Sequence, residues 1–517
     1  MIYTARSINT VSRKGVAALK NKPLWNWTNN MRTVTLFSSP AALAQQMFFA
    51  TLPTDIDSDN DDNTTSNNKV EDTTKPNSED KRNKATNTKF RKSSPLDSLP
   101  VTFADISRAQ VAIRDGIKRT TCEKSFFLSE LIGSNVYLKT ENQQFTGSFK
   151  ERGARNAILS LITGEGGEEF KEHSGCIAAS AGNHALAMAY HGKELGVNVT
   201  VVMPTVAPLA KVDKCKRFGA RVIIHGAHIG EAKEYAETLV EKEGLAYVNG
   251  YDDPPILAGA GTMGIEIVDQ VPDLDIVVVP VGGAGLIAGL ACAIKTLKPD
   301  AKIIGVEPEF CPSYINALKA GKPVVTETTP TLADGLAVPL VGSHAFEVAR
   351  HYVDECVTTT EKEIAIAVLR LIENEKMVVE GGGASGLAAL LPGGKLDRAD
   401  LKGKNIVVPL CGGNIDTTVL GRVMDRGMAA DHRLVRFTTT VSDRAGGIAN
   451  FTKILAEVGA SIKDIYHERA WLFTSVDQTQ IKVVCELQGK EHAVRVKNAL
   501  CSAGYKLQWL EMQDTKT

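Results

Sequence analysis

The chain has 517 residues and a formal net charge of −1, with 59 Lys and Arg against 60 Asp and Glu. That length exceeds what one hydrophobic core usually fills, so we expect two or more domains. A near-neutral chain without a basic stripe argues against nucleic-acid binding. The nine cysteines include no C-x-x-C pair, which predicts neither a disulfide framework nor a zinc site and favours a reducing compartment.

The N-terminal region is predicted to lie outside the folded domains. Residues 1–54 contain six Lys and Arg and no Asp or Glu, a composition that resembles a mitochondrial transit segment. The alternative is a basic tail on a cytoplasmic enzyme. Residues 55–98 are rich in Asp, Asn, Thr, Ser and Lys and have few large apolar side chains, so we expect a disordered linker there.

Residues 99–426 are predicted to form an α/β domain. Short runs of β-branched residues alternate with helical patterns, which predicts a largely parallel sheet covered by helices on both faces. The expected strands are residues 135–140, 176–180, 199–204, 221–225, 276–281, 302–307 and 405–410. In such sheets, ligands bind at the carboxyl ends of the strands.

One apolar run, residues 276–294, is long enough to cross a membrane. Pro280 and several glycines interrupt this run, and strands buried on both faces are also continuously apolar. We therefore interpret it as a strand, a glycine turn and a helix, and we expect no membrane role.

Lys150 lies in the segment T-G-S-F-K-E-R-G-A, residues 146–154, at a predicted helix start. A lysine amine can condense with an aldehyde, and the small neighbouring residues leave room for a planar ring. Lys150 is therefore a candidate for Schiff-base formation. The alternative is a solvated surface lysine.

A second predicted helix start carries the segment S-A-G-N-H directly after a strand. Its residues are Ser180, Ala181, Gly182, Asn183 and His184. The free backbone N–H groups of such a helix start can hold a carboxylate, and Asn183 can bond a ring hydroxyl. An ordinary helix cap is the alternative.

A third helix start follows the apolar strand at residues 276–281 and reads G-G-A-G-L. Its residues are Gly282, Gly283, Ala284, Gly285 and Leu286. Consecutive N–H groups in a glycine-rich turn form an anion seat that suits a phosphate. The dinucleotide-binding fingerprint fits poorly, because the third glycine comes one residue late. Cys411, in the segment C-G-G-N, ends a further strand, and a buried structural cysteine is the alternative there.

In this order, the four segments resemble the serine/threonine dehydratase branch of the pyridoxal-phosphate enzymes with a tryptophan synthase β-like fold. The resemblance covers residues 99–426 and implies two α/β subdomains around open sheets. It implies that Lys150 binds the cofactor aldehyde as a Schiff base and removes the α-proton of the substrate. The other implied contacts are Phe149 near the ring, Asn183 on the ring hydroxyl, residues 282–286 on the phosphate, Cys411 facing the pyridine nitrogen and residues 180–184 on the substrate.

Two residues depart from relatives in this family. Ala284 stands where glycine is more frequent, and since alanine tolerates positive φ poorly, we expect an ordinary φ there. Ala181 stands where serine racemase has a second serine that reprotonates the opposite face of the substrate. Because Ala181 has no proton to give, racemisation is disfavoured and elimination is expected.

The resemblance also implies a cation site beside the phosphate loop. Glu307, Cys311 and Ser313 match its positions and would contribute a carboxylate, a backbone carbonyl and a side-chain oxygen. Relatives with Asp at the third position take a divalent ion, so Ser313 favours a monovalent ion such as potassium. The alternative is that Glu307 pairs with a surface base.

Residues 433–510 are predicted to form a separate α+β domain in the order β-α-β-β-α-β, a ferredoxin-like sandwich. The segments S-D-R-A-G-G-I at 442–448 and G-A-S-I at 459–462 resemble the ACT domain, a module that often binds amino acids at subunit interfaces. That resemblance implies an amino-acid effector and a homo-oligomer. Dimerisation alone is the alternative.

Together, these features predict an L-threonine ammonia-lyase that also accepts L-serine. It would eliminate water and release 2-oxobutanoate or pyruvate with ammonia. We expect an allosteric enzyme of isoleucine biosynthesis, located in mitochondria. The alternatives are a serine racemase with eliminase side activity and a catalytically inert amino-acid sensor.

Overall fold

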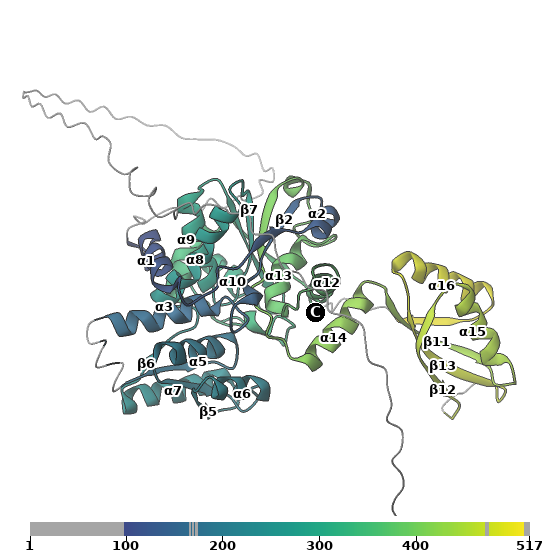
Figure 1. The fold of residues 1–517 in the computed structure, drawn as a ribbon. Coiled ribbons are helices and arrows are strands. Elements are labelled where there is room, and N and C mark those ends of the chain that lie inside the picture. The colour runs from purple at the N-terminus through teal and green to yellow at the C-terminus, as the bar shows by residue number, and fades with distance from the viewer. Residues whose placement is uncertain (1–97, 165–166, 168–169, 171–173, 471–474, 511–517) are drawn as a thin grey trace, which may run out of the picture. The chain divides into compact units, whose positions relative to one another are not determined.

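The computed structural model describes residues 98–164, 167, 170, 174–470 and 475–510 (Figure 1). The predicted transit segment 1–54 and all but the last residue of the predicted linker 55–98 lie outside the described residues. Among the described residues, no helix is long and apolar enough to cross a membrane. The expected strand, turn and helix at 276–294 are confirmed by β7 (Ile276–Pro280) and α9 (Gly285–Leu297).

The larger sheet of the α/β domain has six strands in the order β1-β2-β10-β7-β8-β9. Besides β7, its strands are β1 (Cys122–Lys124), β2 (Asn135–Lys139), β8 (Lys302–Pro308), β9 (Glu355–Thr359) and β10 (Asn405–Pro409). Neighbouring strands are parallel, except that β1 is antiparallel to β2. Every residue of β7 is apolar because the strand is buried along its whole length.

The smaller sheet has four parallel strands in the order β5-β4-β3-β6. Its strands are β3 (Cys176–Ala179), β4 (Val199–Met203), β5 (Arg221–Ile224) and β6 (Ala246–Tyr247). All the strands predicted within residues 99–426 are present. The sequence missed β1, β6 and β9, whose side chains are mostly half-buried or exposed and therefore give no continuous apolar run.

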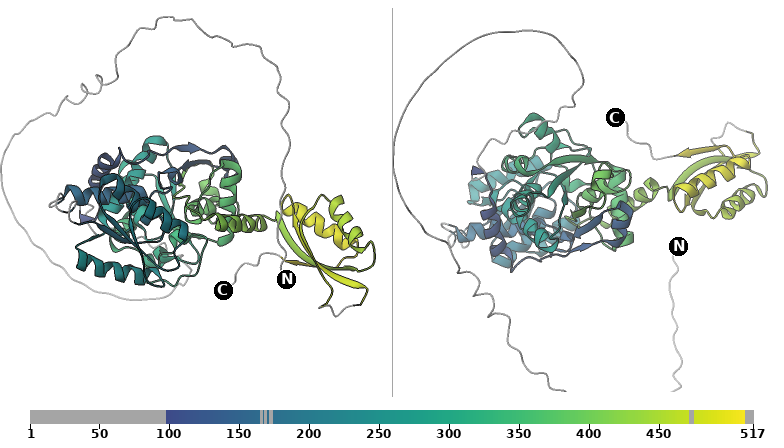
Figure 2. Two further views of the ribbon diagram at one scale, coloured as in Figure 1. Left: turned by 60° about the horizontal axis from the view of Figure 1, so that its bottom comes forward. Right: turned by 90° about the horizontal axis from the view of Figure 1, so that it is seen from above.

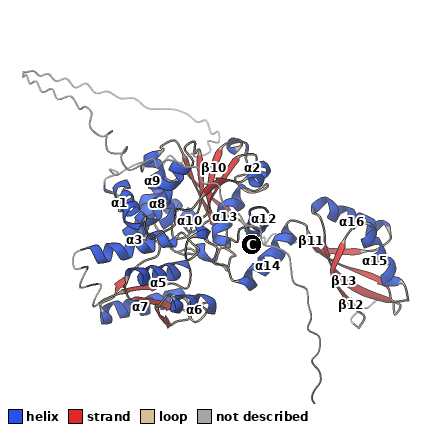
Figure 3. Cartoon of the chain, viewed as in Figure 1, coloured by secondary structure: helices blue, strands red, loops and turns tan. Residues whose placement is uncertain are grey.

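Helices surround both sheets (Figure 3). Besides α9, they are α1 (Phe103–Ile113), α2 (Phe126–Ile132), α3 (Lys150–Thr163), α5 (Asn183–Leu195), α6 (Leu209–Arg217), α7 (Ile229–Glu243), α8 (Pro254–Gln270), α10 (Ser313–Ala320), α11 (Ser343–Tyr352), α12 (Glu361–Arg370), α13 (Gly381–Leu390) and α14 (Thr417–Ala430). Short 3-10 turns lie at Glu141–Gln143, Asp334–Leu336 and Ala399–Leu401, and a π-helical turn lies at Leu371–Glu375. Helix α3 packs against both α5 and α8, so the first turn of α3 lies between the two subdomains.

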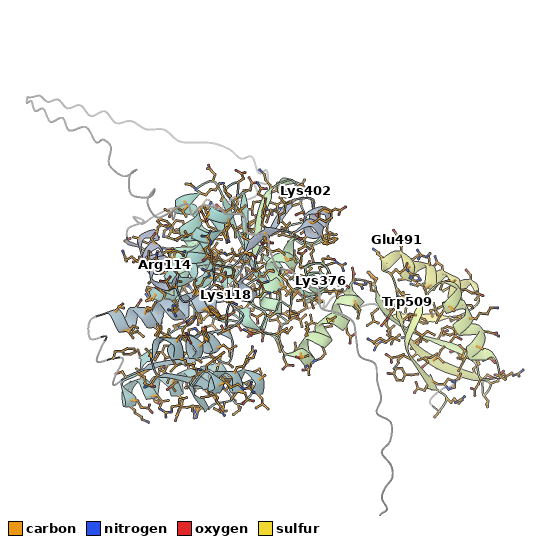
Figure 4. All side chains as sticks on the ribbon, in the orientation of Figure 1. Arg114, Lys118, Lys376, Lys402, Glu491 and Trp509 are labelled. Atoms are coloured by element: carbon orange, nitrogen blue, oxygen red, sulfur yellow. The ribbon has the colours of Figure 1, made fainter. Side chains whose placement is uncertain are left out.

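The C-terminal unit has the predicted order β-α-β-β-α-β (Figure 2). Its elements are β11 (Leu434–Ser442), α15 (Gly447–Glu457), β12 (Ser461–Glu468), β13 (Gln478–Glu486), α16 (Lys490–Ser502) and β14 (Leu507–Leu510). The four strands form an antiparallel sheet in the order β12-β13-β11-β14. Trp509, labelled in Figure 4, stacks on the buried Phe437 with ring centroids 5.0 Å apart. This unit therefore has its own aromatic core.

Candidate active site

Lys150 is the first residue of α3, and its side chain is half-buried. Its Nζ donates a hydrogen bond of 2.5 Å to the carbonyl oxygen of Gly250 and lies 5.1 Å from the centre of the Phe149 ring. Burial lowers the pKa of the Lys150 amine from 10.5 to about 8. The neutral amine, the form that condenses with an aldehyde, is therefore much more populated than in an exposed lysine.

The Lys150 segment is joined to the segment that carries Cys411. The Phe149 N–H donates to the Cys411 carbonyl oxygen at 3.0 Å, and Ser148 forms an isolated antiparallel bridge with Gly412. Because Cys411 follows β10, these contacts place Lys150 at the carboxyl end of that strand. Burial raises the pKa of the Cys411 thiol well above its usual range, so the thiol stays neutral.

The glycine turn at 282–286 is joined to Lys150 through Tyr251, the residue after Gly250. A Cβ added at Gly283 would lie 2.3 Å from the Tyr251 ring, and one at Gly285 would lie 2.3 Å from the Tyr251 carbonyl oxygen. Only glycine allows these approaches. The first N–H groups of α9 have no partner within the helix and are available to an anion.

Ala284 has a φ of 68°, so our expectation of an ordinary φ at this position was wrong. Ala284 is the N-cap of α9, and the chain turns there in the left-handed region to enter the helix directly after β7. The tight packing of Gly283 and Gly285 against Tyr251 leaves this turn no alternative course. The conformation costs an alanine about 1 to 2 kcal/mol.

The segment 180–184 also contacts the Gly250 segment, because a Cβ added at Gly250 would lie 2.7 Å from the His184 ring. The Ser180 hydroxyl accepts a hydrogen bond from the Gly182 N–H at 3.2 Å, and α5 begins at Asn183. The His184 Nε2 lies 3.1 Å from the Val248 carbonyl oxygen, so this nitrogen carries the proton and donates. Burial lowers the pKa of His184 to about 3, and the ring is therefore neutral.

Two residues that the sequence analysis did not single out hold Asn183 in place. Its Nδ2 donates to Glu380 Oε1 at 2.6 Å, and its Oδ1 accepts from Asn414 Nδ2 at 3.0 Å. Asn414 Nδ2 also donates to the Thr146 carbonyl oxygen at 2.7 Å. Burial raises the pKa of Glu380 to about 7. Asn414 belonged to the C-G-G-N segment, whereas the only sequence signal for Glu380 is its place before three glycines that start α13.

The residues of the expected cation site are close together but form mainly a helix cap. Glu307 accepts hydrogen bonds from the N–H groups of Tyr314 and Ile315 at 2.7 and 2.9 Å, and the Ser313 hydroxyl lies 3.5 Å from Glu307 Oε1. Burial raises the pKa of Glu307 to about 7. The Cys311 thiol bonds a loop carbonyl instead. Within the described part of the chain, no three His, Cys, Asp or Glu residues form a metal-binding group.

The arrangement fits pyridoxal phosphate on observations of this structure. It offers an amine of lowered pKa and a glycine-lined helix start, joined through Gly250 and Tyr251. The Ser148 hydroxyl, two residues before Lys150, is fully buried and has no hydrogen-bond partner among the described residues. Buried polar groups without partners are uncommon in native proteins, so this hydroxyl indicates room for a ligand.

The fold and the site define a pyridoxal-phosphate enzyme of the tryptophan synthase β-like class. The chain belongs to the family described as pyridoxal-phosphate dependent enzyme, whose model matches residues 113–412. It is similar to the L-threonine ammonia-lyase of Thermotoga maritima, at 40% identity over 407 residues that cover 79% of this chain and 99% of that protein. The predicted fold class is confirmed, and the chain is an enzyme.

Two solved structures show the same fold. One is the processed form of threonine deaminase isoform 2 from Solanum lycopersicum, with 35% identity and a TM-score of 0.57 over 62% of this chain and 93% of that chain. The other is serine racemase from maize, with 30% identity and a TM-score of 0.59 over 64% of this chain and 99% of that chain. The fold therefore serves both elimination and racemisation.

The expectation of a mitochondrial location was wrong. The curated relatives that match this chain with high identity and coverage come from bacteria, which have no mitochondria. The expectation rested only on the basic composition of residues 1–54, and these residues lie outside the described part of the chain. A basic segment poor in acidic residues is therefore insufficient to assign a compartment.

Proposed function

We propose that this protein is an L-threonine ammonia-lyase that also deaminates L-serine, eliminating water to give 2-oxobutanoate or pyruvate and ammonia. The observation that carries the proposal is the buried Lys150 amine, held on Gly250 beside a glycine-lined helix start. The 40% identity to the L-threonine ammonia-lyase of T. maritima supports threonine as the substrate.

In this proposal, each segment of the site has a distinct task. Pyridoxal 5′-phosphate would supply an electron sink for the α-carbon of the substrate, and Lys150 would hold its aldehyde. Lys150 would also remove the α-proton, since its lowered pKa makes it a base at physiological pH. The N–H groups of residues 282–286 hold the phosphate. Residues 180–184 receive the substrate carboxylate, while Asn183 bonds the ring hydroxyl and Phe149 packs beside the ring.

Cys411 explains why elimination is favoured over transamination. Its thiol faces the pyridine nitrogen in this proposal, and burial raises the thiol pKa so far that no negative charge develops there. Without a carboxylate to keep that nitrogen protonated, the electron sink is shallow. A shallow sink favours rapid expulsion of the β-hydroxyl.

Racemisation is the rival reaction, because the maize serine racemase has the same fold and 30% identity. A racemase needs a proton donor on the face opposite Lys150. Ala181, in the segment that receives the substrate carboxylate, has no titratable or hydroxyl group. Elimination is therefore the reaction that the side chains of this site support.

The decisive experiment is replacement of Lys150. We expect Lys150→Ala to abolish 2-oxo acid formation from both amino acids and to remove the visible absorption of the bound cofactor, with the far-UV circular dichroism unchanged. Lys118→Ala is the control, because Lys118 is exposed and its amine bonds the Gln143 carbonyl oxygen and lies over the Phe145 ring. Retained turnover in Lys150→Ala would refute the assignment, and a wild-type protein without visible absorption would indicate an inert sensor.

A monovalent cation, potassium, is the second part of the proposal. The contact between Glu307 and Ser313 supports a cation site there, and the Cys311 carbonyl oxygen would complete it. Because Glu307 already accepts two backbone N–H groups, the site has little spare negative charge, which favours a monovalent over a divalent ion. We expect potassium to raise the melting temperature more than sodium or magnesium does. An equal response to all three would exclude a specific potassium site.

The C-terminal unit, residues 433–510, is proposed to be an ACT domain that binds an amino-acid effector in a homo-oligomer. Its β-α-β-β-α-β order and the G-A-S-I segment at 459–462 support this. Isoleucine and valine are the two amino acids to test as effectors, because 2-oxobutanoate would serve isoleucine biosynthesis. Initial rates with and without each amino acid test the effector, and light scattering tests the oligomer. Unchanged rates would leave dimerisation as the role of the unit.

A further inference from the structure

We infer that Glu380 and Asn414 are positioning residues that lock the side chain of Asn183 in one orientation, so that its Nδ2 keeps an N–H for the cofactor ring oxygen. This inference rests on the proposed function, in which Asn183 bonds that oxygen. It adds two residues and a fixed hydrogen-bond direction to the site.

The direction follows from one backbone group. The Thr146 carbonyl oxygen can only accept, so the Asn414 atom that lies 2.7 Å from it must be Nδ2. The same Nδ2 lies 3.0 Å from a side-chain atom of Asn183, which must therefore be the acceptor Oδ1. Asn183 then has its Nδ2 on the side of Glu380, where the carboxylate accepts at 2.6 Å.

This chain of hydrogen bonds leaves one N–H of the Asn183 Nδ2 unused. An amide NH₂ has two hydrogens, and Glu380 takes one of them. Asn414 takes one of the two lone pairs of Oδ1, and no other hydrogen bond of the Asn183 side chain occurs among the described residues. The N–H that remains is a donor, which stabilises a ring oxygen in its deprotonated, negatively charged form.

The backbone at Gly412 shows that the carboxylate of Glu380 is held tightly. A Cβ added at Gly412 would lie 2.3 Å from Glu380 Oε1 and 3.0 Å from Asn183 Nδ2. The Glu380 N–H also donates to the Gly412 carbonyl oxygen at 3.0 Å, so the backbone of Glu380 is tied to the same residue. Glu380 is only 7% exposed, and water therefore competes poorly for Asn183. The glycine after Cys411 is required by this contact.

The test compares two replacements of Glu380. Glu380→Ala removes the acceptor, whereas Glu380→Gln keeps a side-chain oxygen that can accept from Asn183. We expect Glu380→Ala to weaken pyridoxal-phosphate binding roughly tenfold, the factor of one net hydrogen bond, and to shift the bound cofactor toward its near-ultraviolet, neutral form. Glu380→Gln should restore both the affinity and the visible spectrum. Equal behaviour of the two variants, in either direction, would overturn the inference.

A second variant keeps the inference testable if Glu380→Ala fails to fold. Asn414→Asp replaces the donor by an acceptor, so it opposes the orientation of Asn183 while conserving size. We expect the same weaker binding and spectral shift as in Glu380→Ala, and a spectrum like that of the wild type would overturn the inference. Glu363→Gln is the matched control, because Glu363 also accepts hydrogen bonds at a helix start, from Thr359 and Thr360, and should leave the cofactor unaffected.

The design separates this inference from the proposed function. If borohydride reduction of the wild-type protein links no cofactor to Lys150, the proposed function fails before any variant is measured. If the wild type is labelled at Lys150 and the three variants at 380 and 414 bind and absorb as it does, only the inference fails.

Discussion

The Nζ of Lys150 and the carbonyl oxygen of Gly250 are 2.5 Å apart, and this carbonyl belongs to a segment that contacts the rest of the site. A Cβ on Gly250 would lie 2.7 Å from the His184 ring, so the segment rests directly on the start of α5. The next residue, Tyr251, packs against Gly283 in the phosphate turn. One stretch of backbone therefore sets the position of the amine relative to the starts of both α5 and α9.

The pH dependence of cofactor loading should reflect the pKa of Lys150. Burial lowers this pKa from 10.5 to about 8, and only the neutral amine condenses with an aldehyde. The neutral fraction rises with pH, so the loading rate of cofactor-free protein should rise as the pH passes through about 8 and then level off. Stopped-flow absorbance measures this rate. A rate that still rises tenfold per pH unit well above that midpoint would mean that the amine is solvated.

Gly285→Ala should impair the phosphate turn. The added methyl group would lie 2.3 Å from the Tyr251 carbonyl oxygen, and both groups are backbone-bound and cannot rotate away. Overpacking of this kind costs about 1 to 3 kcal/mol, and we expect most of it to appear as weaker pyridoxal-phosphate binding in a fluorescence titration. Gly421→Ala is the control, because nothing lies within 4 Å of the added Cβ in α14. Equal affinities in the two variants would contradict the proposed phosphate site.

Ala284→Gly should stabilise the protein. Ala284 has a φ of 68°, which is strained for alanine and unstrained for glycine. We expect a gain of about 1 kcal/mol in the free energy of unfolding, since the relief of strain exceeds the added entropy of the unfolded chain. Ala288→Gly, inside the same helix, should instead cost about 1 kcal/mol. Denaturant unfolding of both variants measures these two opposite changes in the free energy of unfolding. A loss of stability in Ala284→Gly would be inconsistent with strain at Ala284.

The sequence predicted the parts of this fold that repeat with a regular period. The central strands were recognisable because burial on both faces makes β7 continuously apolar and leaves Thr200 as the one polar residue of β4. The helix starts were recognisable because glycine and small residues follow those strands directly. The small residues around Lys150, at a predicted helix start, made it a Schiff-base candidate.

The contacts between distant segments could not be predicted. Glu380 reaches Asn183 across 197 positions of the chain, and its only local signal is its place before three glycines. The positive φ of Ala284 also escaped prediction, because it depends on how Tyr251 crowds the neighbouring glycines. Conformational propensity is a property of one residue alone. The Glu380–Asn183 contact and the positive φ of Ala284 both arise from packing between elements.

A buried network of charges behind Lys150 gives a prediction of stability. Arg152, two residues after the lysine, is fully buried and makes paired hydrogen bonds of 2.8 Å to both Glu141 and Glu266. Lys139 Nζ donates to Glu266 at 2.5 Å, so two cations balance two carboxylates. Removing one partner of a buried pair costs about 3 to 5 kcal/mol because the other charge stays uncompensated.

Arg152→Met should therefore lower the free energy of unfolding by about that amount. Arg221→Met is the matched control, since Arg221 pairs with Glu243 at the surface, where its side chain is 56% exposed. Exposed pairs contribute about 0 to 1 kcal/mol. Thermal unfolding of the cofactor-free proteins compares the two variants without any contribution from the ligand. Similar melting temperatures in the two variants would mean that water solvates the charge that Arg152→Met leaves unpaired.

Ala181→Ser should add racemisation to elimination. Ala181 precedes Gly182 and Asn183 at the start of α5, in the segment proposed to receive the substrate carboxylate. A hydroxyl at this position can return a proton to the face opposite Lys150, which alanine cannot do. We expect D-serine to appear from L-serine, measured by chiral chromatography, while 2-oxo acid formation falls.

Since a serine also stands at 180, Ser180→Ala in the Ala181→Ser background tests whether the new hydroxyl acts by itself. If Ala181→Ser binds cofactor normally and yields no D-serine, position 181 does not decide between the two reactions.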